Sequence, residues 1–138
     1  MKSIKNDPLF TKSMTFLGWS GFACVVFFII GGVLLGGMLP PLFNSADPAA
    51  EFARKVTEDA FSLRLGSAFM VLSFALFGTL GAGIAAQQRR VEINPVFSIV
   101  QAIFGAGGMT IGVLVAFAWG LAAFRPELYH PSVIVSWI

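Results

Sequence analysis

Residues Asn94 to Arg125 read NPVFSIVQAIFGAGGMTIGVLVAFAWGLAAFR. No charged residue lies between Glu92 and Arg125. At about 1.5 Å of rise per residue, a helix of this length is longer than the roughly 30 Å hydrocarbon core of a bilayer. Asn94 is suited to cap such a helix, and Pro95 suits its first position, where a missing N–H group has no helical partner to lose. The stretch therefore predicts a transmembrane helix over residues 95–124.

One face of this predicted helix is made of small residues at four-residue spacing. It carries Gly108, Gly112, Ala116 and Gly120, and Gly105 and Gln101 extend it toward the start of the helix. In lipid, small residues let helix backbones approach closely and gain van der Waals contact. The pattern predicts a surface on which another helix packs.

The composition places the chain among membrane proteins. Of its 138 residues, 57% are hydrophobic and 12% are charged, whereas charged residues are about 25% of soluble domains. The net charge is only +2 and the basic residues are dispersed among acids, so no stripe for binding nucleic acid is present. A single cysteine, Cys24, excludes an internal disulfide framework and a cysteine-based metal cluster. The expected partners are membrane lipids and other transmembrane helices, of the same or another chain.

The N-terminal third predicts a first span. Residues 1–13 carry Lys2, Lys5 and Lys12 against Asp7, which favours a cytoplasmic N-terminus. The apolar run over residues 14–39 is longer than the roughly 7–15 residues of a signal-peptide core, and no A-x-A-like cleavage site follows it. We therefore favour an uncleaved span over a signal peptide. Within it, Gly32 and Gly36 form a G-x-x-x-G pair suited to helix packing.

Residues 40–62 predict an outer loop with an amphipathic helix. Pro40 and Pro41 end the first span, and Asp47 with Pro48 begins the new helix. Opposite charges lie four residues apart in the pairs Glu51–Lys55, Arg54–Glu58 and Lys55–Asp59, whereas Phe52, Val56, Ala60 and Leu63 form an apolar stripe. The charged face is expected to be solvated, with a docking site for a partner as the alternative.

Residues 63–86 predict the second span, and residues 87–94 a short cytoplasmic loop that carries Arg89 and Arg90. So short a loop predicts an antiparallel hairpin with the third span. Small residues at Gly78 and Gly83, among others, give the second span two packing faces. Five basic residues lie on the predicted inner side (Lys2, Lys5, Lys12, Arg89 and Arg90) and four on the outer side (Arg54, Lys55, Arg64 and Arg125).

Residues 125–138 predict an outer loop and the start of a fourth apolar segment, PSVIVSWI, from Pro131. This segment reads as the first turns of a further span in a longer polytopic protein, with a short interfacial anchor around Trp137 as the alternative. The predicted fold is thus all-α. It is a polytopic transmembrane helical bundle with three full spans, the start of a fourth, and an amphipathic outer helix after the first span.

The second half carries Glu92, Pro95, Gln101, Trp119 and the stretch Ala122-Ala123-Phe124-Arg125-Pro126-Glu127. On these residues it resembles a family of uncharacterised bacterial multi-pass integral membrane proteins. The resemblance implies a bacterial inner membrane and a chain that continues into further spans. It implies no activity, substrate or cofactor.

Four polar residues are candidates for contact with a ligand: Arg64, Gln101, Arg125 and His130. Arg64 begins an apolar run and is expected to pair with Glu127 or with Glu58 and Asp59; the alternative is an anionic ligand or lipid headgroup. The amide of Gln101 is expected to bond a neighbouring helix backbone or the hydroxyl of Ser67, Ser73 or Thr79, with a place in a transport pathway as the alternative. His130 is expected to be an interfacial loop residue rather than a ligand-binding or proton-handling group.

No catalytic, cofactor-binding or metal-binding motif is evident. Gly81, Gly83 and Ala86 match a dinucleotide fingerprint, but they lie inside an apolar helix rather than on a strand-to-helix turn. We therefore expect a non-enzymatic accessory or helix-packing subunit of a larger membrane protein or complex. A carrier of a small apolar molecule or lipid, contacting Gln101 and Arg64, is the alternative. An enzyme acting on membrane substrates would need groups from a partner chain.

Overall fold

The computed structural model describes residues 8–37 and 48–136, and these residues form helices and connecting turns without a strand. Three helices are long: α1 (Pro8–Phe28), α3 (Ala60–Val91) and α4 (Val96–Ala122). A π-helix, η2 (Ile29–Leu35), continues α1. The shorter elements are α2 (Ala49–Glu58), the 3₁₀ turn η3 (Pro126–Leu128) and α5 (Pro131–Ser136). The predicted all-α fold is confirmed.

Three segments are long and apolar enough to cross a membrane. They are Thr11–Leu35, with a mean hydropathy of 2.1, and Ala60–Val91 and Val96–Ala122, each with a mean hydropathy of 1.9. Large apolar side chains lie exposed along all three, including Phe22, Leu72 and Phe104. In lipid this exposure is favourable, because acyl chains are as apolar as the side chains they surround. The structure is that of a multi-pass membrane protein.

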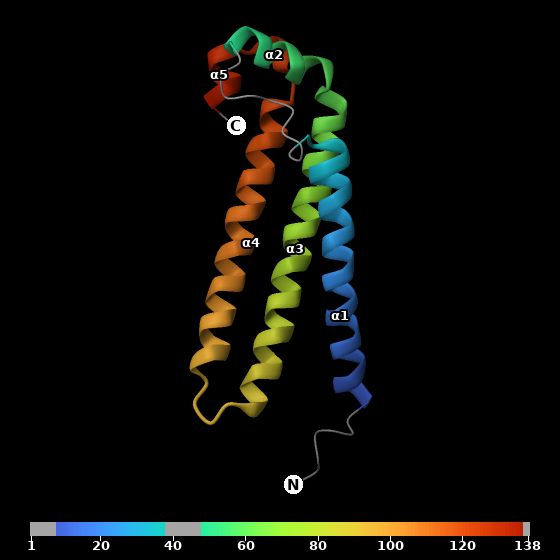
Figure 1. The fold of residues 1–138 in the computed structure, drawn as a ribbon, viewed down its shortest axis with the longest axis vertical. Helices are drawn as coiled ribbons and strands as arrows, with labels where there is room; N and C mark the ends of the chain where they lie inside the picture. Colours follow the sequence, from blue (N-terminus) through green and yellow to red (C-terminus); the bar gives the residue numbers. More distant parts are fainter. Residues whose placement is uncertain (1–7, 38–47, 137–138) are drawn as a thin grey trace.

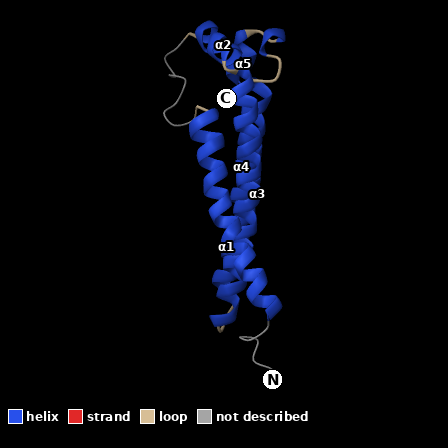
Figure 2. Ribbon diagram, turned by 90° about the vertical axis from the view of Figure 1, so that its right-hand side faces the viewer, coloured by secondary structure: helices blue, strands red, loops and turns tan. Residues whose placement is uncertain are grey.

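Helix α3 is the central element. It lies between α1 and α4 and packs along both, whereas α1 and α4 do not pack along each other (Figure 1). The α3–α4 loop lies at one end, which we call the hairpin end, near the start of α1. Helices α2 and α5 lie together at the opposite end, the cap end, and the side view in Figure 2 places them across the ends of the long helices.

The cap end holds a buried apolar cluster. Its members are Ala53 and Val56 of α2, Leu63 of α3, Ala122 and Ala123 at the end of α4, and Ile134 of α5, with Phe52 and Trp119 packed against them. The apolar stripe predicted for the amphipathic helix therefore faces protein. Helix α5 contributes to the same cluster through Ile134, which is 1% exposed.

The helix boundaries differ from the predicted ones in detail. Helix α3 extends beyond residues 63–86 at both ends. After η2, Gly37 has a φ of 59°, a left-handed conformation that suits glycine. Pro40, Pro41 and Asp47 lie outside the described residues. Helix α4 begins at Val96 with Pro95 as its N-cap residue, one position later than predicted.

The side chain that satisfies the start of α4 comes from Glu92 rather than Asn94. The backbone N–H of Ser98 donates to Glu92 Oε2 at 3.2 Å. A carboxylate near a helix N-terminus is favourable because it complements the partial positive charge of the unpaired N–H groups. Glu92 thus caps the start of α4, the role that was expected of Asn94.

Candidate functional site

The π-helix η2 and helix α3 approach closely where two glycines, Gly31 and Gly66, face each other. A Cβ atom added to Gly66 would lie 2.7 Å from the carbonyl oxygen of Gly31, and one added to Gly31 would lie 2.7 Å from the carbonyl oxygen of Gly66. Both residues are buried. Only glycine permits this approach, because any side chain would meet backbone atoms that cannot move independently.

Serines of α3 bond to backbone carbonyls of the helices on either side. Ser73 Oγ donates to Cys24 O at 2.8 Å, and Ser67 Oγ donates to Ala116 O at 2.6 Å. Nearer the cap end, Ser62 Oγ donates to Leu35 O at 3.0 Å. Hydroxyl groups between transmembrane helices contribute about 0.6 kcal/mol each on average. These bonds join α3 to both of its neighbours.

The π-helix η2 supplies acceptors to this network. In a π-helix the hydrogen bonds run from residue i to residue i+5, so its end presents carbonyls in positions that an α-helix would not. The carbonyl of Leu35 accepts from Ser62, and that of Gly36 accepts from Trp119 Nε1 at 3.1 Å. Trp119 belongs to α4, so this bond crosses from the third long helix to the end of the first.

The small-residue face predicted on α4 lies against α3 over most of its length. Gly105, Gly112 and Ala116 are buried. An added Cβ at Gly105 would lie 3.6 Å from Gly81 Cα, one at Gly112 would meet the ring of Phe74, and one at Gly120 would meet Ser67 Oγ. Gly108 is exposed, and a Cβ atom added to it would lie 3.3 Å from the Phe77 ring.

The remaining glycines predicted to pack against helices also contact other parts of the same chain. Gly83 faces Leu17 of α1, at 2.9 Å from an added Cβ to Leu17 Cδ1, and Gly78 faces Met109 of α4. Gly32 and Gly36 are buried at the η2 end of the first helix. Gly83 and Gly78, one from each small-residue face predicted for the second span, thus contact two different helices.

A further set of small residues is left uncovered. Ala75, Ala82 and Ala86 of α3 are exposed and follow seven- and four-residue spacing, which places them on one helix face. Ala102 and Ala106 of α4 are also exposed. Ala86 and Ala102 line the same depression of about 240 Å³ at the hairpin end. We call these five residues the alanine face; it includes residues of both α3 and α4.

A larger open groove lies between α3 and α4 near the cap end. It has a volume of about 590 Å³, and its walls include Arg64, Val71, Leu72, Phe117, Leu121 and Phe124. Apart from Arg64 and Ser67 its lining is made of apolar residues and glycine. The side chains of Phe117 and Phe124 are 58% and 53% exposed. A volume of this size lies within the range of about 300–1,000 Å³ seen for small-molecule sites.

Arg64 lies at the cap end of this groove and is exposed. Its Nε donates to Ala60 O at 3.1 Å, one turn earlier in α3. The expected ion pairs with Glu58, Asp59 or Glu127 are not formed; among the described residues no carboxylate lies within salt-bridge distance of Arg64. Its terminal guanidinium nitrogens therefore remain available to an anion outside the protein.

Gln101 and His130 do not join Arg64 in one site. Gln101 lies in the second turn of α4, near the hairpin end. Its side-chain amide makes no hydrogen bond to another described residue. The hydroxyls expected to bind it donate elsewhere, that of Thr79 to Ala75 O. His130 is exposed, and its Nδ1 lies 2.9 Å from Ser132 Oγ.

Arg125 lies closer to the groove. It has a left-handed backbone with φ of 63°, and its guanidinium carbon lies 5.9 Å from the centre of the Phe124 ring. A cation at this distance over an aromatic ring is favourably placed. Phe124 is also a wall of the groove that Arg64 lines, so Arg125 lies beside one wall of that groove.

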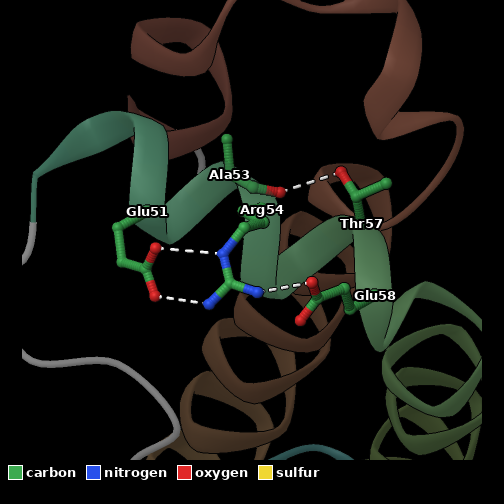
Figure 3. Close-up of polar contacts among 5 residues, drawn as sticks. All are labelled: Glu51, Ala53, Arg54, Thr57 and Glu58. Atoms are coloured by element: carbon green, nitrogen blue, oxygen red, sulfur yellow. Dashed lines mark hydrogen bonds and ion pairs between the residues drawn. The ribbon is translucent and has the colours of Figure 1, made fainter.

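The charged face of α2 is an ion-pair network on the surface (Figure 3). Arg54 Nη2 lies 2.6 Å from Glu51 Oε1, and Arg54 Nη1 contacts Glu58 Oε1. Hydrogen bonds that Arg54 donates to Glu51 and to Glu58 raise the pKa of Arg54 above its already high usual value, with the larger effect from Glu51. Arg54 therefore stays charged throughout the accessible pH range, and its ion pairs lie on the exposed face of α2.

No group of three potential metal-binding side chains (His, Cys, Asp or Glu) gathers anywhere in residues 8–37 and 48–136. Cys24 lies 3.5 Å from Ser73 Oγ, in the contact between α1 and α3. The chain matches no protein-family model, no curated protein and no solved structure. The likeness of the second half to bacterial multi-pass membrane proteins thus stays a prediction.

The sequence did not indicate the groove or the π-helix. The groove forms because Arg64, Ala68 and Val71 of α3 meet Phe117 and Leu121 of α4 across the hairpin, which depends on the register of the two helices. The four-residue spacing of Phe117, Leu121 and the nearby Phe124 is the one signal that was available, and it is common in apolar helices.

Proposed function

We propose that this chain is a non-enzymatic accessory subunit of a larger membrane protein or complex, and that its alanine face receives a further transmembrane helix. The observation that supports this is the exposure of Ala75, Ala82, Ala86, Ala102 and Ala106 on adjoining helices. Small residues lose little by facing lipid, but they allow a helix to approach closely where bulky residues would not.

The predicted packing glycines have a different role in this proposal. Gly112 and Gly120 face α3 of the same chain, so enlarging them tests the folding of the subunit. Ala82 and Ala106 face outward, so enlarging them tests its association. The two sets of variants thus separate assembly within the chain from assembly with a partner.

The experiment is to compare Ala82→Leu and Ala106→Leu with the wild-type protein, extracted in mild detergent and sized by native mass spectrometry. We expect the wild type to carry additional transmembrane mass and the variants to lose it while keeping their helical circular dichroism. Gly18→Leu is the matched control, because Gly18 is exposed on α1 and has no atom within 4 Å of an added Cβ. Wild-type protein that is a bare single chain in both detergent and lipid nanodiscs would refute the proposal.

We place the subunit in a bacterial inner membrane with a cytoplasmic N-terminus. The support is the basic N-terminal segment and the two arginines in the last turn of α3, Arg89 and Arg90. By sequence, five basic residues are predicted on the inner side and four on the outer side. Cysteine labelling tests this, with Cys24 replaced by serine and single cysteines introduced at Asn94 or Ser132. A membrane-impermeant maleimide added to intact cells should label the Ser132 position and not the Asn94 position.

A further inference from the structure

We propose that the groove at the cap end binds one anionic phospholipid, with its phosphate on Arg64 and an acyl chain between α3 and α4. Three features lead to this occupant: the depth of Arg64 in the membrane, the shape and chemistry of the groove, and the absence of a carboxylate partner for Arg64 within the described residues.

The depth follows from the length of α3. Arg64 and Arg89 lie in the same helix, and at about 1.5 Å per residue they are roughly 37 Å apart along its axis. The hydrocarbon core is about 30 Å thick, and the headgroup regions extend it to about 40–45 Å. If α3 spans the bilayer, each arginine lies just beyond one edge of the hydrocarbon, which is where lipid phosphates lie.

The groove below Arg64 fits an acyl chain better than a helix. Phe117 and Phe124 are more than half exposed along it, and Leu72 is 50% exposed. Bulky side chains of this kind keep a helix backbone at a distance, whereas a flexible chain can lie between them. The small residues suited to helix contact, Ala82, Ala86, Ala102 and Ala106, lie nearer the hairpin end. Lipid binding at the cap end is therefore compatible with a partner helix on the alanine face and does not depend on one.

Charge complementarity selects an anionic lipid. Arg64 uses its Nε on Ala60 O, which leaves the two terminal nitrogens to donate to phosphate oxygens. Guanidinium groups bind phosphate through such paired donors. Arg125, above the Phe124 ring, adds a second positive charge near the cap end of the groove, and a zwitterionic headgroup would bring its own cation toward these arginines.

The test is lipid retention by the full chain, measured by native mass spectrometry after exchange into phosphatidylglycerol or phosphatidylcholine with matched acyl chains. The wild type should retain one phosphatidylglycerol about tenfold or more tightly than phosphatidylcholine. Arg64→Gln should remove this preference, whereas Arg64→Lys should keep part of it. Arg54→Gln is the control, since it also removes one positive charge but lies on α2 outside the groove.

A second variant tests the acyl chain and protects the result against misfolding. Ala68→Trp fills the groove beside an intact Arg64 and should weaken retention of phosphatidylglycerol while the helical circular dichroism is unchanged. Equal retention of the two lipids by the wild type, or an equal loss from Arg54→Gln, would overturn the proposal. So would displacement of the lipid by millimolar glycerol 3-phosphate, which would mark a free-anion site. A change in subunit stoichiometry of Ala68→Trp without a change in lipid retention would assign the groove to a protein partner instead.

Discussion

Two alanine substitutions in α3 isolate the steric basis of the helix contacts. At Gly66, an added Cβ would lie 2.7 Å from Gly31 O and 2.8 Å from Gly36 N. Both are backbone atoms, so the overlap is relieved only if the end of the first helix moves away. At Gly81, the nearest atom to an added Cβ is Gly105 Cα at 3.5 Å, an ordinary van der Waals contact. The same methyl group therefore meets rigid backbone at one site and available space at the other.

The magnitude follows from comparing the two sites. Alanine is a better helix former than glycine by about 1 kcal/mol, and this gain applies to both variants. Overpacking a well-packed contact costs about 1–3 kcal/mol and applies only to Gly66→Ala. The variants should therefore differ by about 1–3 kcal/mol, with Gly81→Ala as stable as the wild type or more so and Gly66→Ala less stable.

The assay is reversible unfolding in mixed micelles with increasing sodium dodecyl sulfate, followed by circular dichroism. The expected difference corresponds to a change of about 5- to 140-fold in the unfolding equilibrium constant. Gly31→Ala should behave like Gly66→Ala, because its added Cβ would lie 2.7 Å from Gly66 O. Equal unfolding midpoints for Gly66→Ala and Gly81→Ala would refute the close approach of η2 to α3.

Two further predictions concern hydrogen bonding and the cap. In the same assay Ser67→Ala should lower the unfolding free energy by about 0.6 kcal/mol, and by no more than about 1.7 kcal/mol, because it removes the hydrogen bond to Ala116 O. Thr110→Ala is the control: it loses only a hydrogen bond within its own helix, to Ala106 O, and should lower the unfolding free energy by less. At the cap end, Val56→Ala should cost about 1–3 kcal/mol, because Val56 is 0% exposed, and should speed amide hydrogen exchange in α5. Arg54→Ala should change neither the unfolding free energy nor the exchange rate in α5, because its ion pairs are on the surface. Faster exchange in α5 of this variant would show that the ion pairs, rather than the apolar cluster, stabilise the packing of α2 against α5.

The sequence predicts the long helices because their signals are local. An uncharged run, a short loop with Arg89 and Arg90, and an apolar stripe with Val56 and Leu63 are each contained in one stretch of chain. It also indicates which faces are small, but not what covers them. Gly83 and Gly78 lie within five residues of each other yet face different helices, and this follows from the crossing of α1 over α3.

The polar residues of the site depend even more on tertiary placement. Arg64 was expected to pair with an acidic residue, and Gln101 with a hydroxyl of a neighbouring helix, because suitable groups occur in segments expected to lie nearby. The hydroxyls of Ser67 and Ser73 instead bond to carbonyls 49 residues away in the sequence. Partners so far apart in the sequence produce no periodic pattern in it. The hydrogen bonds between helices and the groove beside Arg64 can therefore be identified only from the packed structure.

The wide turns of η2 make chain length in Ile29–Leu35 matter as much as residue identity. Each such turn accommodates one residue more than an α-turn does, so the angular phase of the side chains slips as the chain passes through it. Removing a single residue there would restore α-helical phase and rotate Gly36 out of reach of the Trp119 indole, even though the segment would remain equally apolar. A one-residue deletion in this segment should consequently be more harmful than most conservative replacements.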